Sequence, residues 1–178
     1  MPFTTLDLSK QSGTSLPSSI VTASGLTTGK VLQVVRSALS TTAYSTSSTM
    51  ATTGMTASIT PSSSSNYLFA IVTCHYQLYT STGNGTATEP FGGFRLRVTP
   101  SGGSADTKSD ITVRHINFDT SENDEMRSAA TLTGYWSPSS AVAQSLDLHF
   151  SADNGRLGIY GTDQHTNGSA ITVMEIAG

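Results

Sequence analysis

The stretch NYLFAIVTCHYQLY, residues 66–79, is the longest apolar run in the chain. Aromatic and β-branched side chains are frequent in it, and a serine-rich loop with one proline, SITPSSSS (58–65), precedes it. An apolar run bounded by turn residues is typical of a strand that is covered on both faces. The stretch therefore predicts a β-sheet protein in which residues 66–79 form a central strand.

On either side of this run, segments alternate apolar and polar residues with the period of two that half-buried strands show. The clearest alternation lies at residues 91–100, 110–118, 145–152 and 169–178. Further strands are expected at residues 30–39, 54–60, 128–136 and 156–161. Helical spacing of apolar residues is nearly absent, and abundant Ser, Thr and Gly lower the helix propensity throughout.

Short turn sequences separate these segments, and they contain residues that adopt a positive φ at little cost. The turns are Asn84-Gly85, Gly102-Gly103, Asn154-Gly155 and Asn167-Gly168. Eight to ten strands joined by such turns predict an all-β fold, a two-sheet antiparallel β-sandwich. A jelly-roll-like arrangement is our first expectation and an immunoglobulin-like sandwich the second. We expect this domain to span residues 30–178.

Residues 1–29 differ from the rest, because their apolar side chains are isolated among Ser, Thr and Gly. Such a segment cannot form a core alone, so it is either a flexible tail or an arm that orders against a neighbouring subunit. The spaced apolar residues favour the arm. We therefore expect an extended N-terminal attachment arm with the contact residues Phe3, Leu6, Leu8, Leu16, Ile20 and Val21.

Composition argues against several classes of function. Charged residues make up 12% of the chain, about half the usual share, and the net charge is −3. This balance lacks the basic footprint of a nucleic-acid-binding protein. No stretch of 18 apolar residues predicts a membrane span, and the N-terminus lacks the pattern of a signal peptide. The single cysteine, Cys74, lies in an apolar run and is expected to be buried and inert.

Candidate catalytic and ligand-binding patterns fail at specific positions. GLTTGKV (25–31) is not a phosphate-binding loop, because Ser24 stands where the first glycine belongs and Val31 where Ser or Thr belongs. The acidic residues Asp119, Glu122, Asp124 and Glu125 lack the spacing of a calcium loop; we expect a solvated connection, with calcium or a polar partner contact as alternatives. The histidines form no metal-ligand pair in sequence, and a solvent-facing imidazole is expected at His149. They are His75, His115, His149 and His165.

No nucleophile motif is present, so we predict no catalytic, cofactor-binding or metal-binding residue. Several aromatic residues in strands could line a sugar-binding surface, although such residues more often fill a core or a subunit interface. They are Tyr67, Tyr76, Tyr79, Tyr135, Trp136 and Tyr160.

Both ends of the sandwich segment resemble a known module. GKVLQV (29–34) is followed by a Ser/Thr-rich strand pair, GMTASITPSS (54–63) and the apolar strand, and the chain finishes with GSAITVMEIAG (168–178). This pattern resembles a module of virion structural proteins in tailed bacteriophages, especially those of cyanobacteria and marine bacteria. The resemblance covers residues 29–178, and its middle is only loosely patterned. Such modules occur at the distal end of tail fibres and as small stand-alone decoration proteins of the virion.

The resemblance implies a trimeric β-sandwich and no catalytic residues. In long fibres the module follows a lengthy shaft, so we expect the short leader here to attach the domain to the particle. The expected function is that of a non-enzymatic, homotrimeric short tail fibre or host-adhesion protein, with capsid decoration (cement) as the alternative. Expected partners are baseplate, tail or major capsid proteins and a host cell-surface glycan, without nucleic acid, membrane insertion or a cofactor. The expected location is the virion, after synthesis in the host bacterial cytoplasm.

Overall fold

The computed structural model describes residues 29–79, 90–115, 125–164 and 168–178, and these residues form ten β-strands. The strands are β1 (Val31–Ala38), β2 (Ala43–Ser45), β3 (Ala51–Ile59), β4 (Tyr67–Tyr79), β5 (Phe91–Pro100), β6 (Asp106–Arg114), β7 (Glu125–Trp136), β8 (Gln144–Asp153), β9 (Arg156–Ile159) and β10 (Ala170–Ile176). Within the described ranges there is no helix long and apolar enough to cross a membrane. The predicted all-β fold is confirmed.

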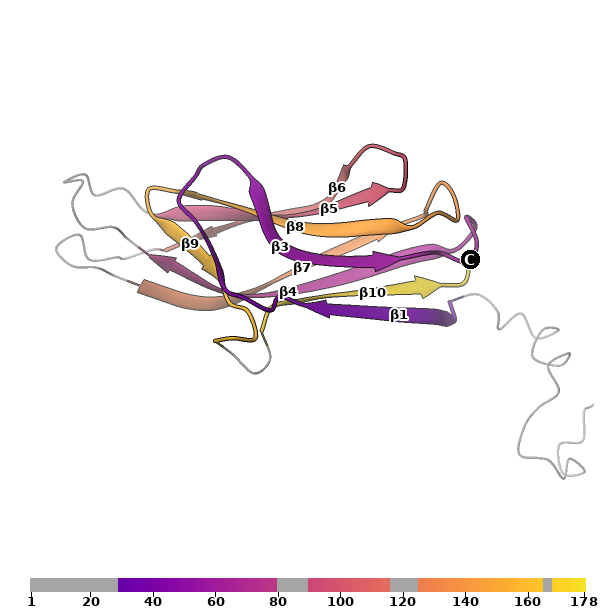
Figure 1. Cartoon of the computed structure of the whole chain (residues 1–178), viewed down its shortest axis with the longest axis horizontal. Helices are drawn as coiled ribbons and strands as arrows, with labels where there is room; N and C mark the ends of the chain where they lie inside the picture. The colour runs from indigo at the N-terminus through magenta and orange to yellow at the C-terminus, as the bar shows by residue number, and fades with distance from the viewer. Residues whose placement is uncertain (1–28, 80–89, 116–124, 165–167) are drawn as a thin grey trace, which may run out of the picture.

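All strand pairs are antiparallel, and they form the two layers of a sandwich (Figure 1). The first sheet has the order β1-β10-β4-β7. The long strand β4 pairs with β7 along one edge; along its other edge it pairs first with β10 and then with β9, which continues to β2. The second sheet has the order β3-β8-β5-β6.

The strand pairs are nested, as in a long hairpin that has been rolled up. Strand β5 pairs with β6, β4 with β7, β3 with β8 and β1 with β10, so each pair encloses the previous one along the chain. Without the short β2 and β9, eight strands are divided equally between the two sheets. This nesting is the jelly-roll arrangement, which confirms the first expectation over the immunoglobulin-like sandwich.

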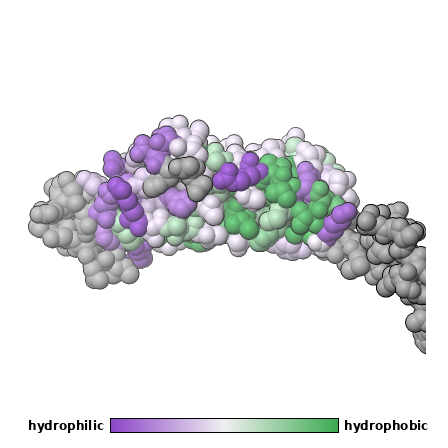
Figure 2. Space-filling model, turned by 90° about the horizontal axis from the view of Figure 1, so that it is seen from below, coloured by the Kyte–Doolittle hydropathy of each residue, from purple (hydrophilic) through white to green (hydrophobic). Residues whose placement is uncertain are grey.

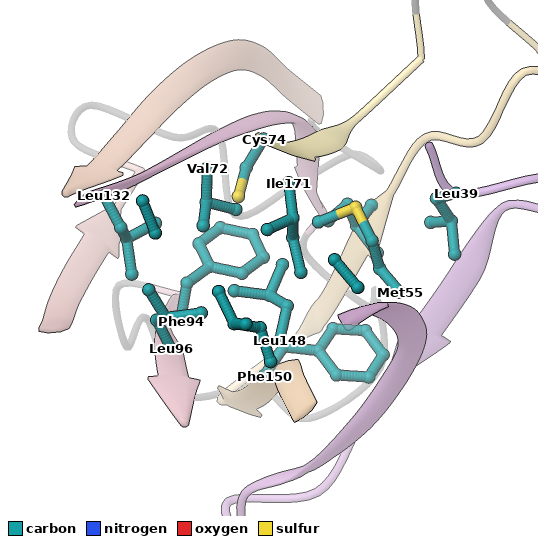
Figure 3. Packing of buried hydrophobic residues seen from close by; sticks show 14 of the residues in the cluster. Leu39, Met55, Val72, Cys74, Phe94, Leu96, Leu132, Leu148, Phe150 and Ile171 are labelled. Carbon is teal, nitrogen blue, oxygen red and sulfur yellow. The ribbon is translucent and has the colours of Figure 1, made fainter. Parts of the chain in front are cut away.

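The core fills the space between the sheets with residues of one phase from each strand (Figure 3). Phe94, Leu96 and Leu148 of the second sheet face Val72 and other residues of the first. The apolar phases that alternation predicted in β5, β8 and β10 are the buried ones. Two of the predicted turns agree, since Gly102 and Asn154 have φ values of 76° and 56°. Asn84, Gly85 and Asn167 of the other two lie outside the described residues.

The strand β4 is central, as predicted, but only one of its faces is buried throughout, because Gln77 is the one buried residue on the other face. Its even-numbered residues from Leu68 to Leu78 point into the core, whereas Tyr67 and Thr73 are exposed and Phe69 and Ile71 are half-buried. The expectation of cover on both faces is therefore wrong for the described chain. The outer face of the first sheet keeps the apolar character of a buried surface without a layer of described residues over it.

Candidate binding surfaces

Apolar side chains form a continuous surface on the outer face of the first sheet. Strand pairing places Val34 of β1, Met174 of β10, Phe69 of β4 and Tyr135 of β7 side by side, in one row across the whole sheet. The next row holds Val31, Ile176 and Tyr67. We call these seven residues the apolar face.

Much of the apolar face is accessible to solvent. Val34 is 57% exposed and Tyr135 is 60% exposed, while Val31 and Tyr67 are also exposed. The rings of Tyr67 and Tyr135 stack with their centroids 5.1 Å apart, so the two aromatic residues form one broad surface. Figure 2 shows hydrophobic residues gathered over one part of this side of the molecule. Soluble monomers rarely expose a contiguous apolar patch of this kind, which typically marks a protein interface.

The other end of the same sheet has a different chemistry. The guanidinium of Arg156 lies 4.7 Å from the ring centroid of Tyr44 and 4.9 Å from that of Tyr79. These distances are typical of cation–π contacts. Nearby in the same sheet, the Tyr160 hydroxyl donates a hydrogen bond of 2.7 Å to Gln77 Oε1. Polar and cationic groups therefore separate this end from the apolar face.

A polar pocket of about 230 Å³ lies on the outer face of the second sheet. Its base is Gly93 of β5, flanked by Thr112 of β6 and Ser151 of β8 in the strand register. The absence of a side chain keeps the pocket open, because a Cβ at Gly93 would lie 2.9 Å from Met50 Cε. The other lining residues are Ser48, Phe91, Gly92, Arg95, Asp110 and Asp153.

The pocket combines a fixed ion pair with uncommitted polar groups. Arg95 Nη2 lies 2.5 Å from Asp110 Oδ2, and both side chains are partly exposed. Within the described residues, the side chains of Thr112, Ser151 and Asp153 make no hydrogen bond. Hydroxyl and carboxylate groups of this kind can exchange hydrogen bonds with a ligand that carries several hydroxyls. Sequence reasoning did not find this pocket, because its residues come together only through the register of three strands.

A buried carboxylate anchors the serine-rich loop that precedes β4. Glu175 of β10 is 1% exposed and accepts hydrogen bonds from Gln33 Nε2 at 2.6 Å, Asn66 Nδ2 at 2.6 Å and both the backbone N and Oγ of Ser62 at 2.7 Å. Burial alone raises the pKa of Glu175, but the hydrogen bonds from Asn66, Gln33 and Ser62 outweigh it and lower the pKa to about 2. The group is fully paired and therefore structural. Its position on the buried phase of residues 171, 173 and 175 was the sequence signal for it.

The residues that the sequence singled out lie in different environments. Cys74 is buried, as expected, and burial raises the pKa of its thiol to about 12. His149 points outward and is half-buried rather than freely solvated; this partial burial and the charge of Arg97 lower its pKa. The arm residues Phe3, Leu6, Leu8, Leu16, Ile20 and Val21 lie outside the described residues, as do His165, Asp119, Glu122 and Asp124.

The remaining candidates do not come together as a site. Glu125 begins β7 and pairs with Arg127 of the same strand. Within the described ranges, no group of three or more His, Cys, Asp or Glu side chains could hold a metal ion. Tyr76, Trp136 and Tyr160 are buried, whereas Tyr67 and Tyr135 belong to the apolar face. Tyr79 lies beside Arg156 at the other end of the sheet. The six candidate aromatic residues are thus divided between the core, the apolar face and this end.

No family model matches the chain, and no curated protein matches its sequence. Some solved structures are similar in shape over most of the chain. A Clostridium thermocellum xylanase 10B structure with its CBM22-1 and GH10 modules is 8% identical, with a TM-score of 0.35, and the match covers 83% of this chain and 25% of that one. The infectious bursal disease virus VP2 subviral particle is 12% identical, with a TM-score of 0.31, covering 83% and 37%. The chain spans less than half the length of either structure.

Proposed function

We propose that the chain is a non-enzymatic structural protein of a tailed-bacteriophage virion. In this proposal it forms a homotrimer and acts as a short tail fibre that adheres to the host surface. The observation that carries the proposal is the contrast between its two outer faces. One sheet presents an apolar face suited to permanent assembly, and the other presents a polar pocket suited to reversible contact.

The apolar face supports self-association. A phage particle offers many copies of its own proteins at fixed symmetry axes, and closed symmetric oligomers are the usual way to cover such a surface. Fully burying a Val or Phe side chain contributes roughly 1.5–3 kcal/mol, so burial of this row of four apolar residues would offset part of the cost of association. The resemblance of residues 29–178 to a trimeric virion module favours three copies.

The polar pocket supports adhesion to a host glycan. Sugar hydroxyls both donate and accept hydrogen bonds, which matches the hydroxyls of Thr112 and Ser151 and the carboxylate of Asp153. Phe91 also lines the pocket, and the guanidinium of Arg114 lies over its ring, 5.3 Å from the centroid, so at most the other parts of the ring can contact sugar C–H groups. The pocket is smaller than the roughly 300–1,000 Å³ of drug-sized ligand sites, so it suits a single sugar ring.

Binding to lipopolysaccharide purified from the host tests this assignment. Replacing Asp153 with Asn removes a charged hydrogen-bond acceptor, and such bonds contribute roughly 1.5–3 kcal/mol. We therefore expect Asp153→Asn to weaken binding roughly tenfold or more, as measured by surface plasmon resonance. Asp106→Asn is the matched control, because Asp106 is an exposed carboxylate of β6 outside the pocket lining. Equal affinity for the wild-type chain and Asp153→Asn would remove the pocket from the proposal.

Capsid decoration is the second candidate function, and the position of the apolar face favours it. Val31 and Ile176 of this face lie next to Gly29, where the described chain begins. The face and the preceding segment could therefore dock together on a capsid. A cryo-electron microscopy reconstruction of the virion separates the two functions. Density at the tail or baseplate supports the fibre, density at threefold positions of the head supports decoration, and absence from the particle refutes both.

The non-enzymatic part of the proposal has its own test. A depolymerase of the same architecture would cleave host polysaccharide and release reducing ends. We expect no reducing ends above the level of a heat-denatured sample. Sustained release proportional to protein concentration would contradict the proposal.

A further inference from the structure

We propose that the apolar face of each copy is covered by residues 1–28 of a neighbouring copy. This inference rests on the homotrimer proposed above and names the contact that holds it together. The first observation concerns β4, whose composition is typical of a strand covered on both faces. Its outer face, however, has no layer of described residues over it.

Threefold symmetry limits what can cover the apolar face. In a ring of three copies the contact is heterologous, so a surface on one copy meets a different surface on the next. Three flat faces placed around the axis meet their equivalents only close to it, so they cannot cover one another fully, as two faces do in a twofold dimer. The remaining part of each face requires a second apolar element of a neighbouring copy.

Residues 1–28 have the composition of that element. Apolar side chains recur along the segment, and Asp7 and Lys10 are its only charged side chains, so its side-chain charge is zero. The apolar face contains no charged residue, so its contact with the apolar side chains of the segment desolvates no side-chain charge as long as Asp7 and Lys10 stay in water. Backbone groups of an added segment would still require partners, which are water on its outer side and, where it passes beside β1, the edge of this outermost described strand.

The point of attachment and the length of the segment fit the same arrangement. Gly29 N donates a 2.9 Å hydrogen bond to Ala177 O, and Ala177 N donates a 2.8 Å bond to Lys30 O. The chain is thus fixed to the sheet beside the apolar face. Strands lie about 4.8 Å apart, so a four-strand face is less than about 20 Å wide. A segment of 28 residues can reach up to roughly 90 Å, which leaves Phe3, Leu6 and Leu8 able to contact the next copy.

Photo-crosslinking in the full-length protein tests this contact. Tyr135 is replaced by p-benzoylphenylalanine, which keeps an aromatic ring at an exposed position of the apolar face. Normal and isotope-labelled chains are unfolded, mixed, refolded and irradiated, and crosslinked peptides are identified by mass spectrometry. The same replacement at Tyr44 is the control, because Tyr44 is 50% exposed on β2, outside the apolar face.

We expect crosslinks from position 135 to fall within residues 1–28 and to join normal with labelled chains, and crosslinks from position 44 to lack that pattern. Crosslinks to residues 1–28 of the same chain alone, to the sandwich of another copy, or to no peptide would overturn the inference. Native mass spectrometry of the same sample separates the two proposals. A trimer with any of these contrary patterns refutes only the arm contact, whereas a monomer refutes the trimer itself.

Discussion

Glu175 shows how one residue can determine the pH dependence of a β-sandwich. Its usual pKa of 4.5 falls to about 2 in the folded chain. Because the folded pKa is the lower one, the stabilisation is complete above about pH 4.5 and is lost as the pH falls towards 2. At about 1.4 kcal/mol for each pH unit between the two pKa values, the contribution is about 3 kcal/mol.

We predict that Glu175→Gln lowers the free energy of unfolding by about 2–3 kcal/mol near neutral pH, since the new amide donor faces the donors of Asn66, Gln33 and Ser62. The difference from wild type should shrink as the pH approaches 2, where the wild-type carboxylate is also lost. Urea unfolding at both pH values measures this. Asp106→Asn removes an exposed carboxylate that pairs with Lys108, and it should change the free energy of unfolding far less at neutral pH, because exposed ion pairs contribute little. If Glu175→Gln lowers the free energy of unfolding by the same amount at both pH values, the loss comes from packing rather than from the carboxylate charge.

At the residue scale, sequence alone predicted some positions and missed others for a physical reason. The burial of Cys74 followed from its apolar neighbours, and Glu175 could have been found from its phase in β10. The pocket residues Arg95, Asp110 and Ser151 were not predictable, because each is an ordinary polar residue on the outward phase of its own strand. Only the register between strands places them together.

Among the elements, β3 contains a local irregularity that can be tested separately. Its register with β8 shifts between Thr52 and Thr56, and Gly54 within that interval has φ of 82°. A Cβ at Gly54 would meet no atom within 4 Å, so a substitution there tests the backbone conformation alone. The Thr53 hydroxyl donates a 2.9 Å hydrogen bond to Leu148 O, which holds the irregular segment on β8.

We predict that Gly54→Ala lowers the free energy of unfolding by about 1 kcal/mol or more, because residues with a Cβ disfavour a positive φ. Ser58→Ala is the control, since Ser58 is exposed in the regular part of the same strand, opposite Ser145. Thermal unfolding followed by circular dichroism measures both variants. If Gly54→Ala and Ser58→Ala have the same melting temperature, the positive φ of Gly54 does not contribute to the stability of β3.

The alternation of apolar and polar residues predicted most strands, because a half-buried strand needs apolar side chains on one face and polar side chains on the other. It worked for β5, β8 and β10, where polar and apolar phases are distinct. It did not predict β2, whose three residues are too few to show a period. For β4 the composition indicated cover on both faces, whereas the described residues cover only one. This difference between composition and burial is the strongest sign of an intermolecular contact.

At the scale of the whole molecule, the proposed assembly should depend on apolar burial and little on charge. Raising the salt concentration to about 1 M shortens the Debye length to about 3 Å and weakens contacts between exposed charges. An interface formed by the apolar face should persist under these conditions and weaken on cooling, as apolar burial does. Sedimentation velocity over a dilution series, at low and high salt, measures the dissociation of the trimer.

Two neighbouring substitutions in β1 make this prediction specific. Val34→Asn places an amide in the middle of the apolar face and should weaken association roughly tenfold or more, given about 1.5–3 kcal/mol for a buried Val side chain. Arg36→Gln removes the next exposed side chain on the same face of the strand, outside the apolar rows, and should leave association unchanged. If high salt dissociates the trimer, or if Arg36→Gln weakens it more than Val34→Asn, charged groups rather than the apolar face hold the copies together.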